Sequence, residues 1–160
     1  PPPLVKTTPG ATNTLKPPPP TRAPTPTTAM LAAAAEPPYH ISYGGRTVLQ
    51  YAEDTANAFI QSARSDYEGA GAFNLSGLSA HMEEVKDAII TARPDAKELI
   101  TFEDFQLPFP MEVDGSGLEE AVGAIHHKAL ADAIGETIEM FAGLIRDGKI
   151  DPKQYIAERS

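Results

Sequence analysis

The chain has 160 residues, a formal net charge of −9 and no cysteine. The acidic balance argues against nucleic acid and anionic membrane as partners, because both attract clustered lysine and arginine. The lack of cysteine excludes a disulfide scaffold and a cysteine metal site. The longest apolar run, 29–35, is far shorter than the ~20 residues that span a bilayer, and the first residues lack a signal-peptide pattern. We therefore expect a soluble, cytoplasmic protein.

Proline dominates the beginning of the chain. Ten of the sixteen prolines lie in residues 1–26, where they remove backbone donors while threonine and alanine supply little to bury. We expect residues 1–27 to be disordered and partly polyproline II. Proline, threonine and alanine are also what GC-rich codons yield out of frame, so we hypothesise a shifted reading frame upstream. The rest divides into a folded part, 28–148, and a tail, 149–160.

The first expected elements follow the proline tract. The sequence TAMLAAAAE, residues 28–36, consists of helix formers with Thr28 as a possible N-cap, and two prolines end it. Two extended segments, 39–45 and 46–52, flank a pair of glycines and predict strands around a glycine turn.

The spacing of apolar residues then changes to that of a helix. Apolar residues at i, i+3, i+4 and i+7 predict a helix from Asp54 to near Ser65, with the face Ala56, Phe59, Ile60 and Ala63. A short strand is predicted over 71–77, between glycines. Ser79 is predicted to cap a second helix with the apolar face Met82, Val85, Ile89 and Ala92, which Pro94 ends.

The remaining segments predict a strand, a loop and two helices. Residues 99–105 read as a strand, and the prolines of 107–114 predict a loop. Ser116 with Glu119 forms a capping-box pattern for a short helix. The clearest helix has apolar residues recurring from Leu130 to Ile145, with Asp147-Gly148 as its stop. Alternating strands and helices indicate the α/β class, with about four strands and four to five helices.

Several of these segments, in this order, resemble one family. GGRTVLQYAEDTANAF resembles the segment of extended short-chain dehydrogenase/reductases, the NAD-dependent epimerase/dehydratase family, in which a strand and VxDxA open a helix. Four later segments also resemble segments of this family, in the same order along the chain: GAFNLSG, SAHMEEVKDAI, VDGSGLEEAVG and LADAIGETIEMF. The likeness covers 28–147 and is greater to dehydrogenase-like members acting on sugar acids than to nucleotide-sugar epimerases.

The resemblance covers only the substrate-side, C-terminal part of such an enzyme. The glycine-rich GxxGxxG turn that cradles the cofactor pyrophosphate is absent, and none of the five tyrosines begins a YxxxK. The resemblance implies an incomplete Rossmann-like domain from an NAD- or NADP-dependent oxidoreductase or epimerase acting on a sugar, nucleotide sugar or sugar acid. We expect no cofactor-binding or catalytic residues in this chain, and no cofactor bound to it alone.

Two residues are candidates for substrate binding. Arg46 has a planar guanidinium that suits phosphate or carboxylate, although a surface arginine after a turn explains it about as well. Tyr43 matches a family position whose ring lines the substrate pocket, whereas its own pattern favours a strand residue on the core. Asp54 is interpreted mainly as a helix cap and Glu53 as solvated.

Other reactive residues give no functional pattern. The four histidines lack zinc-like spacing, so we predict no metal site. Ser76 and Ser79 show no serine–histidine pattern typical of hydrolases and no GxSxG, which leaves hydrolase chemistry without support. The alternative function is a noncatalytic interaction module whose proline-rich tail recruits partners. A homodimer is left open.

Overall fold

The structure, a computed structural model, describes residues 25–156, which form a mixed α/β arrangement with five α-helices, four short strands and two 3₁₀ turns. Of the segment 1–27 that we expect to be disordered, residues 1–24 lie outside the described part, whereas residues 25–27 are the N-cap and the first residues of α1. The described part contains α1 (Pro26–Ala35), β1 (Tyr39–Ile41), β2 (Arg46–Leu49), α2 (Ala52–Arg64), β3 (Leu78–His81), α3 (Met82–Ala92), η1 (Pro94–Glu98), β4 (Ile100–Phe102), α4 (Ser116–Val122), α5 (Leu130–Arg146) and η2 (Pro152–Gln154).

The strands form two separate pairs. β1 pairs with β4 in parallel, with Tyr39 opposite Ile100. β2 pairs with β3 antiparallel, with Arg46 opposite His81. The glycine turn between β1 and β2 therefore carries the chain from one pair to the other and does not close a hairpin. Each pair is a complete two-stranded sheet within residues 25–156, so every strand there has one edge without a strand neighbour.

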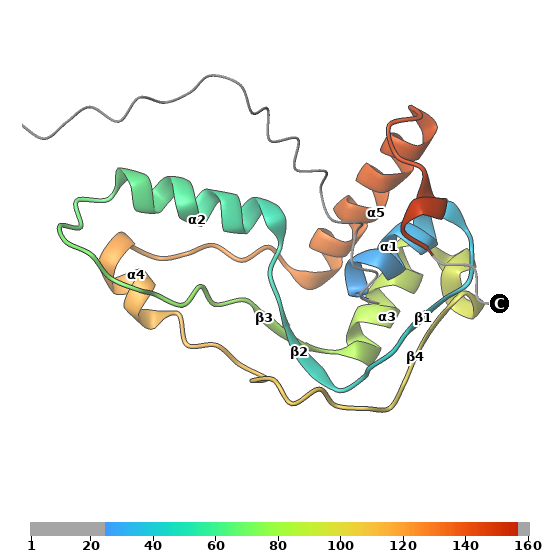
Figure 1. The fold of residues 1–160 in the computed structure, drawn as a ribbon, viewed down its shortest axis with the longest axis horizontal. Helices are drawn as coiled ribbons and strands as arrows, with labels where there is room; N and C mark the ends of the chain where they lie inside the picture. The colour runs from blue at the N-terminus through green and yellow to red at the C-terminus, as the bar shows by residue number, and fades with distance from the viewer. Residues whose placement is uncertain (1–24, 157–160) are drawn as a thin grey trace, which may run out of the picture.

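The main core lies where α1, α3 and α5 pack against β1 and β4 (Figure 1). Its fully buried large side chains are Ile41, Met82, Val85, Ile89, Ile100, Ile134 and Ile138. α3 and α5 each place one apolar stripe inward, as their helical spacing predicted. Residues 149–156, set apart in the sequence as a tail, contact this core through Ile150 and Ile156.

A second, small cluster lies at the other end of the molecule, where α2 and α4 lie side by side (Figure 1). It consists of Ala58, Leu118 and Ile125, with Leu75 and Val122 packed against them. The β2–β3 pair lies between the two clusters.

Helix ends differ from the predictions in several places. α1 begins at Pro26, a residue favoured at the first helical position, and its N-cap is Thr25 in place of Thr28. The N-cap of α3 is His81, which forms a capping box with Glu84, so the assignment of Ser79 was wrong. α4 does begin at Ser116, yet its N-cap is Gly115 and no side chain caps it.

Two predicted strands also need correction. Residues 71–77 form no strand; the extended pairing begins only at Leu78. The segment 99–105 contains a strand of three residues, Ile100–Phe102. The stop of the last helix is confirmed: Gly148 has a φ of 67°, and Lys149 N donates to Leu144 O at 2.9 Å.

Candidate functional site

Arg46 opens β2 and presents its guanidinium beside β3. Its Nη1 donates to the Ser79 carbonyl at 3.1 Å and lies 3.6 Å from Glu84 Oε2. The side chain is 40% exposed. Among residues 25–156 these contacts use only Nη1, which leaves the Nε–Nη2 edge of the guanidinium available to an anion.

The backbone around Arg46 is held by Gln106. The Arg46 N–H donates to Gln106 Oε1 at 2.7 Å, and Gln106 Nε2 donates to the Arg46 carbonyl at 2.9 Å. Next to it, Gly44 N donates to Phe105 O at 2.8 Å. A Cβ on Gly44 would lie 2.2 Å from the Glu103 carbonyl oxygen, so only glycine permits this approach. The 103–106 segment thus fixes where Arg46 sits.

Tyr43 lies just before this turn and packs against the main core. It is half-buried, and the loss of solvent raises the pKa of its phenol. The neighbouring Tyr39 raises this pKa further, by a smaller amount. No hydrogen bond joins Tyr43 to Arg46 in the described part of the chain. The packing matches the strand-residue interpretation, and a role in substrate binding stays a prediction.

A polar group that the sequence did not indicate connects α2 to α5. We call Glu53, Tyr51, Lys128 and Glu136 the lysine cluster. Lys128 Nζ lies 2.6 Å from Glu136 Oε2 and 3.2 Å from Glu53 Oε2. It also lies 4.7 Å from the centroid of the Tyr51 ring, and Tyr51 Oη donates to Glu136 at 2.8 Å. Glu53 is exposed, as its interpretation as a solvated acid requires, and it also pairs with Lys128.

These contacts set the protonation of the lysine cluster. The hydrogen bonds from Lys128 and then Tyr51 lower the pKa of the Glu136 carboxyl. The hydrogen bond to Glu136 raises the pKa of the Tyr51 phenol, and it also raises the pKa of Lys128. Tyr51 is therefore held as a neutral hydrogen-bond donor, which is the opposite of what a general base requires.

Asp54 holds a remote backbone group. It is the third residue of α2 and is 8% exposed, and its Oδ2 accepts from the Lys128 N–H at 2.7 Å. The N-cap of α2 is Tyr51, without a side-chain cap. The cap interpretation of Asp54 was therefore wrong, although its place in the first turn still suits the helix dipole. Its contact fastens 123–129 to α2.

Ser76 has a histidine beside it after all. Its Oγ lies 3.0 Å from His127 Nε2, a contact between residues 51 apart that sequence distance concealed. Within residues 25–156 no hydrogen bond reaches the other ring nitrogen of His127. A nucleophile and base without an orienting third group lack the arrangement that serine hydrolysis uses. The pair joins the 65–77 loop to the chain before α5.

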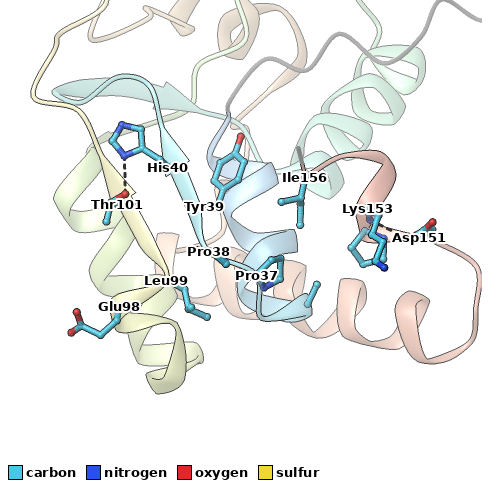
Figure 2. A pocket seen from close by; sticks show the side chains of 12 residues that line it. Pro37, Pro38, Tyr39, His40, Glu98, Leu99, Thr101, Asp151, Lys153 and Ile156 are labelled. Carbon is cyan, nitrogen blue, oxygen red and sulfur yellow. Dashed lines mark hydrogen bonds between the residues drawn. The ribbon is translucent and has the colours of Figure 1, made fainter. Parts of the chain in front are cut away.

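A hollow of about 670 Å³ lies at the beginning of β1 (Figure 2). His40 and Thr101 stand opposite each other in the strand register and both line it. His40 Nδ1 is 2.7 Å from Thr101 Oγ1, and its Nε2 is 3.0 Å from Glu103 Oε1. The other lining residues are Ala35, Pro37, Pro38, Tyr39, Glu98, Leu99, Asp151, Pro152, Lys153 and Ile156. The hollow is mostly apolar and is bounded by the end of α1, the start of β1, the turn before β4 and η2.

No three histidine, aspartate or glutamate side chains of residues 25–156 gather closely enough to bind a metal ion. None of the helices in residues 25–156 combines the length and apolar character that crossing a bilayer requires.

Comparison with protein-family models found no matching family, and comparison with curated proteins found no match.

Proposed function

We propose that this chain is the C-terminal, substrate-side part of an NAD- or NADP-dependent enzyme of the extended short-chain dehydrogenase/reductase type. In this proposal the parent acts on a sugar, nucleotide sugar or sugar acid, and the present residues bind substrate. The sheet of the parent is Rossmann-like and continues beyond β1 and β4. The other half would hold the NAD(P) that exchanges a hydride with a carbinol carbon of the substrate, and a tyrosine of that half would take the hydroxyl proton.

The observation that carries the proposal is the bare parallel pair β1–β4. Parallel strands occur almost only in sheets whose two faces are both covered. Here α1, α3 and α5 pack on the side of Ile41 and Ile100, while the opposite side carries His40 and the exposed Thr101. A parallel pair with one open face and two open edges is what remains when neighbouring strands and helices are absent.

Arg46 supports the assignment to an anionic substrate. Its Nε–Nη2 edge can hold a carboxylate or phosphate through two parallel hydrogen bonds. Gln106 fixes its backbone, which keeps the side chain near the glycine turn. Glu84 lies 3.6 Å from Nη1 and partly offsets the positive charge, so the isolated site binds an anion weakly.

The proposal is tested by adding D-gluconate, an open-chain sugar acid, to the ¹⁵N-labelled chain and following amide chemical shifts. D-glucitol is the neutral control. We expect millimolar gluconate to move the signals of Arg46, Gly45 and Gln106, with no change from glucitol. Arg46→Ala should weaken the response about tenfold, since hydrogen bonds to charged groups are worth ~1.5–3 kcal/mol, while Arg64→Ala leaves it unchanged.

Two results would overturn the proposal. One is a gluconate response that is missing, or equally strong in Arg46→Ala. The other is micromolar binding of NAD to this chain by calorimetry, since the cofactor cradle is assigned to the other half.

A further inference from the structure

Helix α2 is oriented with its apolar face toward solvent. The side facing the molecule carries Asp54, Ala58 and Gln61; Gln61 Nε2 donates to the Val122 and Ala124 carbonyls at 2.8 and 3.1 Å. At 100° per residue, the opposite side carries the i, i+3, i+4, i+7 set. We call Ala56, Phe59, Ile60 and Ala63 the α2 stripe. All four are exposed, Phe59 at 73% and Ile60 at 48%.

The same spacing is buried elsewhere in this chain. In α3 the residues Met82, Val85 and Ile89 are fully buried, and in α5 Ile134 and Ile138 are. An amphipathic helix normally turns its apolar stripe to a core. The α2 stripe runs along one side of a 13-residue helix, about 20 Å long at 1.5 Å per residue. An exposed apolar patch of this form indicates a binding surface.

We propose that the α2 stripe binds the α2 stripe of a second copy of this chain, with the two helices antiparallel. The order of residues along the stripe supports this occupant. A two-fold axis between residues 59 and 60 places Phe59 against Ile60 of the second copy, and Ala56 against Ala63 of the second copy. Two large side chains thus meet at the centre and two small ones at each end. The stripe is self-complementary, as a two-fold interface requires.

Charge at the ends of α2 also favours this arrangement. Glu53 lies in the first turn and Arg64 in the last, and the helical period puts both on the same flank of the stripe. In the two-fold pair, Glu53 then lies about 3 Å along the axis from Arg64 of the second copy. Glu53 binds Lys128 through Oε2, so Oε1 is available for this contact. The antiparallel helix dipoles add to the attraction.

The size of the stripe limits the strength of the dimer. Stable interfaces bury about 1,200–2,000 Å² in total, more than two single helices of 13 residues supply. The dimer is therefore a weak one that exchanges with monomer at about micromolar to millimolar concentrations. It uses a surface separate from β1–β4 and does not depend on the proposed function.

Disulfide trapping tests the geometry, and the chain has no cysteine of its own. Ala56→Cys and Ala63→Cys are made as separate variants of the full chain, which are oxidised alone and as a mixture. In the antiparallel pair position 56 faces position 63, whereas two copies of position 56 are about 10.5 Å apart along the axis, beyond disulfide reach. We expect the mixed disulfide to form several-fold faster than either self-disulfide. Equal rates, or faster self-disulfides, would overturn the antiparallel pairing.

A second measurement does not depend on oxidation. Sedimentation velocity of the full chain should show a rise in mean mass with concentration. Phe59→Asp should abolish the rise, because it places a charge at the centre of the stripe. Phe109→Asp is the matched control, since Phe109 is 68% exposed on a loop outside the stripe. Circular dichroism confirms that both variants keep their helices. A chain that stays monomeric, or a dimer that Phe59→Asp leaves intact, would contradict the proposal.

Discussion

Replacing Asp54 tests whether a single carboxylate fastens the chain before α5 to α2. Asp54→Ala removes the acceptor of the Lys128 N–H, which lies 2.7 Å from Oδ2 at a residue that is 8% exposed. Hydrogen bonds to charged groups contribute ~1.5–3 kcal/mol, and the stranded N–H adds a desolvation cost. We therefore expect opening of this region to become ~10–100-fold more frequent, because each 1.4 kcal/mol is a factor of ten.

Native-state hydrogen exchange at the Lys128 amide measures this opening directly. Asp132→Ala is the control, because Asp132 also occupies the third position of a helix, α5, and loses the same interaction with a helix dipole. That interaction is worth only ~0.3–1 kcal/mol, and Asp132 accepts no hydrogen bond from a distant residue in the described part of the chain. Equal effects of the two substitutions would show that Asp54 acts only as a first-turn acid.

Three further predictions follow from the core, the glycine turn and the lysine cluster. Ile89→Ala should reduce the free energy of unfolding by ~2–5 kcal/mol in a denaturant titration, because it leaves a cavity at a fully buried site; a loss below 1 kcal/mol would contradict the packing. Gly44→Ala should separate the glycine turn from the Glu103 carbonyl, which its Cβ would approach to 2.2 Å, and so broaden the nearby amide signals; unchanged spectra would contradict the close approach. The carboxyl of Glu136 should titrate by ¹³C NMR below its ordinary pKa of 4.5, so its stabilising pair with Lys128 is complete above that value and is lost as pH falls through the lowered pKa. Lys128→Met should return this pKa toward 4.5, and a pKa that does not move would refute the assignment.

The helices could be predicted because their signals are local. In α3 and α5 the spacing of apolar residues identified the buried face, and Asp147-Gly148 marked the end of α5. Such patterns depend on residues within one or two turns of each other. Even the small errors at the N-caps of α1 and α3 follow from this, because several adjacent threonine, serine or histidine side chains can all accept from the first turn.

The strands and the polar contacts could not be predicted in the same way, because each needs a distant partner. GAFNLSG was predicted as a strand from its flanking glycines, yet pairing with β2 begins after Gly77, where the chain comes close to the Leu49 carbonyl. Lys128 meets Glu53 across 75 residues, and Ser76 meets His127 across 51. No spacing rule connects residues that far apart in the sequence.

Helix α2 shows where a correct local prediction still misleads about packing. Its apolar stripe was identified from the sequence, and the helix is present with nearly the expected bounds. The stripe nevertheless faces solvent. The opposite side of the helix faces the molecule, where the side chains of Asp54 and Gln61 form hydrogen bonds with backbone groups of Lys128 and Val122. A periodic pattern specifies which side of a helix is apolar, but the identity of what covers that side is set by the whole assembly. The α2 stripe and the open edges of β1 and β4 share this property: within residues 25–156 each is a surface whose pattern does not identify the partner that would cover it.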